Sequence, residues 1–149
     1  MGLTYEEFEL GAIYNGQART ITEADVVTFA GLSGDFNPIH TDAEAAKNGP
    51  FGERIAHGML TVAISTGMAN MTGLMAGTTI ALMEQNIKYK SAVKFGDTVR
   101  LQMEVIEKRE TSKPDRGIVK LAARMLNQRD ELVVDMVWTQ LMTRQGGES

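Results

Sequence analysis

The chain has 149 residues, of which 43% are hydrophobic and 23% charged, with a net charge of −4 and no cysteine. This composition predicts a single globular domain over residues 1–149 and argues against a basic nucleic-acid-binding face, a membrane helix of roughly 18 apolar residues, and disulfides or a cysteine nucleophile. Because cysteines and a signal-peptide pattern are both absent, we expect a cytoplasmic protein with no nucleic-acid or membrane partner.

A short strand and a capped helix are predicted at the start of the chain. The strand is expected around residues 12–21. Thr22 is a good N-cap, and Asp25 three residues later resembles a capping box. The helix is predicted to run to about Leu32 and to bury residues at roughly helical spacing, namely Val26, Phe29 and Ala30.

A segment rich in Gly, Asn and Pro follows this helix. Ser33 and Gly34 are expected to end the helix, and residues 34–42 are predicted to form a loop. Asp42 can then cap a short helix over residues 43–47, before a second loop begins.

The apolar segment from Gly58 to about Met75 is the strongest helix prediction. It contains no charged residue, and apolar residues lie on nearly all sides of the predicted helix. A helix of this kind is buried, and about 17 residues span roughly 25 Å, the scale of a domain core.

After Gly77 the apolar period changes to two, which predicts four strands. Short polar turns favour antiparallel pairing, with a longer charged connection at residues 107–117. Helices followed by strands indicate the α+β class, with a sheet curled around the apolar helix. The alternating stretches are residues 87–94, 99–105, 119–125 and 131–144.

The chain contains two histidines, and both precede the apolar helix. The first ends the run Ser33-Gly34-Asp35-Phe36-Asn37-Pro38-Ile39-His40, and the second begins His57-Gly58. Imidazole is the usual proton shuttle near neutral pH, and a nearby carboxylate can complete an acid–base pair. This stretch therefore predicts a small acid–base site that the rest of the chain supports.

Taken together, these residues resemble the MaoC-like dehydratase family, which includes the (R)-specific enoyl-CoA hydratases. One family signature is matched by Gly34-Asp35-Phe36-Asn37-Pro38-Ile39-His40, and the start of the family's central helix by Arg54-Ile55-Ala56-His57-Gly58-Met59-Leu60. The resemblance implies a hot-dog fold, in which a curved antiparallel sheet wraps around one long helix. It also implies a homodimer, or a higher oligomer built from dimers, with acyl tunnels near the dimer interface.

The resemblance further implies hydration of trans-2-enoyl-CoA to (R)-3-hydroxyacyl-CoA, or the reverse dehydration. Asp35 and His40 are the implied catalytic pair, and the backbone N–H of Gly58 is the implied oxyanion donor. Ser65 or Thr66 is expected to add a supporting hydroxyl from the central helix. Because the coenzyme A thioester is itself the substrate, no cofactor is expected.

Three further residues are predicted around the substrate site. Asn37 is expected to fix the loop through Asx-type hydrogen bonds more than to contact substrate. His57 either serves the start of the helix or shapes the site. Arg54, or the lysines of residues 88–94, could contact the coenzyme A phosphates, although a solvated strand face is the simpler interpretation of the lysines. A metal site is not expected, because no further His or Cys is expected to supply a third ligand to Asp35 and His40.

Three other functions remain open from the sequence. A dehydratase acting on acyl-carrier-protein substrates would run the same chemistry in reverse. Hot-dog thioesterases often carry a carboxylate on the central helix, and residues 58–75 contain none. A non-catalytic acyl-CoA-binding protein would not need the Asp35 and His40 pair.

Overall fold

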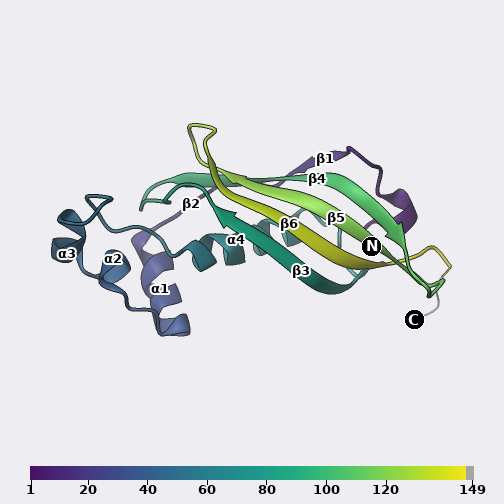
Figure 1. Cartoon of the computed structure of the whole chain (residues 1–149), viewed down its shortest axis with the longest axis horizontal. Helices are drawn as coiled ribbons and strands as arrows, with labels where there is room; N and C mark the ends of the chain where they lie inside the picture. Colours follow the sequence, from purple (N-terminus) through teal and green to yellow (C-terminus); the bar gives the residue numbers. More distant parts are fainter. Residues whose placement is uncertain (147–149) are drawn as a thin grey trace.

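The computed structural model describes residues 1–146, which form a curved antiparallel sheet and a long helix along its inner face (Figure 1). The helical elements are η1 (Tyr5–Glu7), α1 (Glu23–Ser33), α2 (Pro38–Thr41), α3 (Ala43–Lys47) and α4 (Gly58–Met71). The strands are β1 (Ile13–Asn15), β2 (Arg19–Thr20), β3 (Thr79–Tyr89), β4 (Thr98–Glu110), β5 (Arg116–Leu126) and β6 (Leu132–Thr143). The strand order is β1-β4-β5-β6-β3, and β2 pairs with the start of β4 off this path.

The inner face of the sheet and helix α4 share one hydrophobic core. Val105, Leu121 and Trp138 are direct cross-strand neighbours on β4, β5 and β6, and each is at most 2% exposed. They pack in one cluster with residues of α4 such as Leu60 and Met68. Because burying each large apolar side chain contributes roughly 1.5–3 kcal/mol, this layer holds the helix against the sheet.

Local signals explain how α1 begins and ends. The Thr22 hydroxyl accepts from the Asp25 N–H at 3.2 Å, and the Asp25 carboxylate accepts from the Thr22 N–H at 2.9 Å. The helix ends at Gly34, whose φ of 78° suits a residue without a side chain, and the Gly34 N–H donates to Ala30. The predicted cap and capping box are therefore confirmed.

The N-terminal half differs from prediction in two places. The single strand expected over residues 12–21 is two short strands, β1 and β2, because the chain between them passes close to α4. A Cβ at Gly16 would lie 3.3 Å from Met68 Cβ. The loop predicted over residues 34–42 contains the four-residue helix α2, because Asn37 Oδ1 accepts from Ile39 N–H and Pro38 occupies the first helical position.

Helix α4 is shorter and less buried than predicted. It ends at Met71 instead of Met75, since Gly73 adopts a positive φ of 74° that turns the chain away. One side of the helix also faces outward, where Met59 is 56% exposed and Met71 is 62% exposed. Within residues 1–146, no helix has both the length and the apolar character needed to cross a membrane.

The connection after β3 is the main topological difference. The alternation of residues 87–94 is not one strand, because β3 ends at Tyr89 and residues 90–97 leave the sheet. Strand β3 pairs with β6 and not with the next strand β4, so the chain crosses the sheet between them. Strand β4 continues to Glu110, which shortens the charged connection predicted over residues 107–117.

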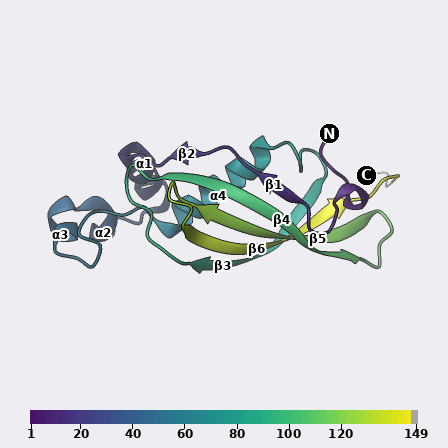
Figure 2. The same cartoon turned by 90° about the horizontal axis from the view of Figure 1, so that it is seen from above.

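Helices α2 and α3 project beyond one end of the sheet, with α1 between them and α4 (Figures 1 and 2). The segment from residue 54 to 57 returns from this projection to the start of α4. It is held on both sides, because the Ile55 N–H donates to the Ile39 carbonyl at 3.1 Å and the Ala56 N–H donates to the Val93 carbonyl at 2.7 Å.

Candidate active site

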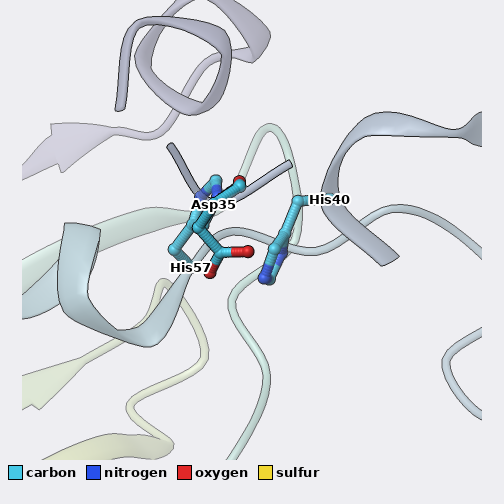
Figure 3. Close-up of side chains that lie close together, drawn as sticks. All are labelled: Asp35, His40 and His57. Carbon is cyan, nitrogen blue, oxygen red and sulfur yellow. Dashed lines mark hydrogen bonds between the residues drawn. The ribbon is translucent and has the colours of Figure 1, made fainter. Parts of the chain in front are cut away.

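Asp35, His40 and His57 meet where α1, α2 and α4 converge. One ligand atom from each of the three side chains lies within 4.8 Å of those of the others. In Figure 3 the Asp35 carboxylate points toward the His40 ring, and His57 lies behind Asp35. The turn after Gly34 and the short helix α2 bring the first two side chains to the same side of the loop.

The hydrogen bond made by His40 determines which of its ring nitrogens is available to accept a proton. Its Nδ1 lies 2.7 Å from the carbonyl oxygen of Ile55. A carbonyl oxygen only accepts hydrogen bonds, so Nδ1 carries a proton and donates it. In the neutral ring, Nε2 is therefore the nitrogen with a free lone pair, and it can accept a proton.

His57 is almost completely buried, at 2% exposed. Its ring stacks on His40 with centroids 3.8 Å apart and planes at 27°, and Phe29 packs against it edge-on with centroids 4.9 Å apart. Its Nε2 lies 2.9 Å from the backbone carbonyl oxygen of Asp35. The second histidine therefore contacts the predicted pair directly.

Helix α4 begins at Gly58 without a side-chain cap. The first N–H groups of a helix have no partner inside it, and no hydrogen bond to the Gly58 N–H is found among residues 1–146. This donor, at the positive end of the helix dipole, suits an oxygen that gains negative charge.

These groups open into a cavity of about 740 Å³. Asp35, His40, His57 and Gly58 all line it, together with Thr61 one turn into α4. The rest of the wall comes from distant parts of the chain, at Phe29, Ser33, Phe51, Ile55, Ala56, Met59, Val134 and residues 89–93. Because most of these side chains are apolar, the cavity suits an apolar ligand with one polar end.

Four predicted site residues lie outside this cavity lining. Asn37 caps α2, as expected of a loop-fixing residue, and Arg54 pairs with Glu23 at 2.7 Å. The hydroxyls of Ser65 and Thr66 donate to carbonyls of their own helix, each at 2.6 Å. The helix hydroxyl that does line the cavity is Thr61, which sequence reasoning missed.

His57 supplies a third nitrogen near Asp35 and His40, so the prediction that no third metal ligand is available was wrong. The directions of the imidazole lone pairs nevertheless disfavour a metal site. Imidazole binds a metal through a lone pair in the ring plane, and stacked rings 3.8 Å apart send their lone pairs side by side instead of toward one ion. One nitrogen of each ring is also bonded to a backbone carbonyl.

Most of the residues that line the cavity could not be predicted from the sequence. From the sequence, Phe29 is predicted to be buried on the helix that ends near Leu32, and Tyr89 falls in the alternating stretch of residues 87–94. Both become site residues because α1 and the end of β3 pack beside the start of α4, which is visible only in the tertiary structure.

Residues 8–124 match the family model described as MaoC like domain. The chain belongs to the MaoC-like domain family. This MaoC-like chain is 32% identical over 133 residues to the 3-hydroxybutyryl-CoA dehydratase of Methylorubrum extorquens, a match covering 89% of the chain and 80% of the relative. It is 34% identical over 111 residues to the (R)-specific enoyl-CoA hydratase of Aeromonas caviae, covering 74% and 78%. It is also 29% identical over 120 residues to the mitochondrial 3-hydroxyacyl-(acyl-carrier-protein) dehydratase of Arabidopsis thaliana, covering 79% and 68%.

Solved structures agree on the fold of this MaoC-like domain. An Archaeoglobus protein described as a monoamine oxidase regulatory protein superposes with a TM-score of 0.91 at 34% identity, over 97% of this chain and 96% of that one. A Mycobacterium tuberculosis protein with a double hotdog fold superposes with a TM-score of 0.84 at 18% identity, over 99% of this chain and 46% of that one. The predicted hot-dog fold is confirmed, and the predicted hydro-lyase class is confirmed by relatives named hydratases and dehydratases.

Proposed function

We propose that this protein adds water to a trans-2-enoyl-CoA to give the (R)-3-hydroxyacyl-CoA, or catalyses the reverse dehydration. The observation that supports this most directly is the Asp35 carboxylate facing His40 at one cavity, beside the Gly58 N–H, which has no hydrogen-bond partner within residues 1–146. The relative named (R)-specific enoyl-CoA hydratase supports this reaction in the direction of hydration, and the relative named 3-hydroxybutyryl-CoA dehydratase supports it in the direction of dehydration.

Asp35 and His40 are spaced to share one water molecule. Their ligand atoms lie within 4.8 Å of each other, and a water making two hydrogen bonds of about 2.8 Å can bridge such a gap. The oxygen of that water forms a bond to C3 of the enoyl group, and the π electrons of the C2–C3 double bond move toward the thioester oxygen. The Gly58 N–H stabilises the resulting enolate oxygen.

The proton balance requires both side chains. One of them accepts a proton from the water, and the other delivers a proton to C2 as the enolate collapses. The sum is one water added across the double bond, and the pair returns to its starting state when the proton passes between the two groups. The Nε2 of neutral His40 has a lone pair that suits acceptance of the proton from the water.

The acyl carrier is the main alternative within this chemistry. A relative is named for an acyl-carrier-protein substrate, so a 3-hydroxyacyl thioester on that carrier is the second candidate. A thioesterase is less well supported, because α4 carries no carboxylate. A purely binding role would leave the facing acid and imidazole without a use.

The deciding assay follows loss of enoyl-thioester ultraviolet absorbance with crotonyl-CoA and longer enoyl-CoA substrates, with chiral analysis of the product. Asp35→Asn and His40→Ala are each expected to lower the rate by about 10²- to 10⁴-fold. Glu44→Gln is a matched control, because its exposed carboxylate lies on α3 outside the cavity lining and pairs with Lys47 of the same helix. Hydration that survives in the Asp35→Asn, His40→Ala double variant would refute the assignment, and thioester cleavage without hydration would favour the thioesterase.

We also propose that the protein is a homodimer that pairs along β3. This strand lies at one end of the sheet, and its outer edge has no strand partner among residues 1–146. It also exposes apolar side chains, at Ile80, Leu82 and Met83. A long apolar edge strand invites further strand pairing, and a second copy of the same edge satisfies it symmetrically.

A further inference from the structure

His57 contacts three separate parts of the site, although only Asp35 and His40 are needed for the proton transfers. We propose that His57 is a positioning residue whose Nε2–H holds the Asp35 loop while its ring holds the plane of His40. The effect on catalysis rests on the proposed hydratase function, whereas the hydrogen-bond arrangement does not depend on it.

The first contact determines where the ring proton lies. The Nε2 of His57 is 2.9 Å from the Asp35 carbonyl oxygen, which accepts hydrogen bonds and cannot donate them. The proton of the neutral His57 ring is therefore on Nε2. This bond joins residues 22 positions apart in the sequence and ties the loop that carries the Asp35 carboxylate to the start of α4.

The second contact orients the neighbouring ring. His40 is held at one edge by the Nδ1 bond to Ile55 and at one face by the His57 ring. Phe29 packs on His57 and supports the stack. With an edge and a face both constrained, the free Nε2 of His40 keeps its direction relative to Asp35.

The third contact is through the main chain. The His57 carbonyl accepts from the N–H groups of Leu60 and Thr61, at 3.1 and 3.3 Å, so His57 is the residue from which α4 starts. The next N–H is that of Gly58. Anchoring the His57 side chain therefore also fixes the oxyanion donor relative to the acid–base pair.

The other ring nitrogen shows that packing alone does not explain this histidine. Nδ1 of His57 is buried and has no hydrogen-bond partner among residues 1–146. A phenylalanine would fill the stack between His40 and Phe29 without leaving a buried polar atom bare. What imidazole adds at this position is the Nε2–H donor to Asp35.

Three substitutions separate the donor from the ring. His57→Phe keeps an aromatic ring and removes the donor. His57→Gln places an amide N–H near the position of Nε2, whereas His57→Asn places its amide near Nδ1, out of reach of the Asp35 carbonyl. We expect His57→Phe and His57→Asn to lower kcat about 10²-fold with little change in KM, because a displacement near 1 Å of catalytic groups can have that effect. His57→Gln is expected to retain at least 10-fold more of kcat than His57→Asn.

A spectrum of the imidazole nitrogens tests the arrangement without any activity measurement. The chain has only two histidines, so long-range proton–nitrogen spectra resolve both rings, and His57→Gln assigns them. At alkaline pH we expect His57 to carry its proton on Nε2 and His40 on Nδ1. A proton on Nδ1 of His57, full kcat in His57→Phe, or equal kcat in the Gln and Asn variants would overturn the proposal. Absence of hydration by the wild-type protein would instead refute the proposed function and leave the nitrogen spectrum as the test of His57.

Discussion

The ring of Tyr89 lies directly against the backbone of Gly58, so that a Cβ added at Gly58 would be 2.5 Å from Tyr89 Cε1. Tyr89 is the last residue of β3, and Gly58 is the first residue of α4. The absence of a side chain at Gly58 therefore lets the end of the sheet close one wall of the cavity beside the proposed oxyanion donor.

Gly58→Ala is expected to lower hydration about 10²-fold, because the new methyl group displaces either Tyr89 or the helix start that carries the donor N–H. Steady-state rates with crotonyl-CoA provide the measurement. Gly67→Ala is the matched control in the same helix, since no atom of residues 1–146 beyond its own stretch of helix lies within 4 Å of a Cβ there. It is expected to keep full activity and to gain up to about 1 kcal/mol of stability. Equal activity in both variants would contradict the role of Gly58.

Lys90 is the lysine expected to meet the charged end of the substrate. It lines the cavity, and it makes no ion pair within residues 1–146, whereas Lys94 pairs with Glu53 at 2.7 Å. Lys90→Ala is expected to raise KM for acyl-CoA about 5-fold, equivalent to about 1 kcal/mol, and to leave kcat unchanged. Lys88→Ala, which does not line the cavity, serves as the control. An unchanged KM in Lys90→Ala, or a loss that also occurs with a short thioester lacking the nucleotide, would contradict this assignment.

The proposed β3 dimer is tested by a charge on its apolar edge. Met83 is 57% exposed, and Met83→Lys is expected to shift the protein from dimer to monomer in light scattering coupled to size exclusion. Leu10→Lys changes a residue that is 65% exposed and lies outside the strands, so it controls for added charge. A wild-type monomer, or a dimer that persists in Met83→Lys, would argue against pairing along β3.

The capping box of α1 is expected to make stability depend on acidic pH. Burial raises the pKa of Asp25, but the Thr22 backbone N–H, the Thr22 hydroxyl and Arg19 together lower it below its ordinary value. The pKa in the folded state is therefore the lower one, so this stabilisation is present above about pH 4 and is lost as pH falls through the folded-state pKa.

Asp25→Ala is expected to cost about 1 kcal/mol at neutral pH, mostly as a lost cap, because Arg19 is half exposed and its ion pair adds little. Urea unfolding at neutral pH and at about pH 2.5 measures the difference. We expect the difference in the free energy of unfolding between wild type and Asp25→Ala to be smaller in acid than at neutral pH. A difference of the same size at both pH values would show that the ionised form of Asp25 does not contribute to stability.

The local features of this protein could be predicted from the sequence alone. Asp35 and His40 lie in one short motif, the alternation of β4 defines its buried face, and Thr22 with Asp25 defines a helix start. Each depends on residues within a few positions of one another, where backbone geometry and side-chain periodicity have direct consequences.

The tertiary structure alone decided the long-range relationships. The pairing of β3 with β6, the stacking of His57 on His40, and the approach of Tyr89 to Gly58 join segments separated by 17 to more than 40 residues. Local pattern shows which face of an element is apolar, but several neighbours could cover that face equally well. The choice among them depends on how the whole core packs, and here that packing places Thr61 in the cavity and Ser65 outside it.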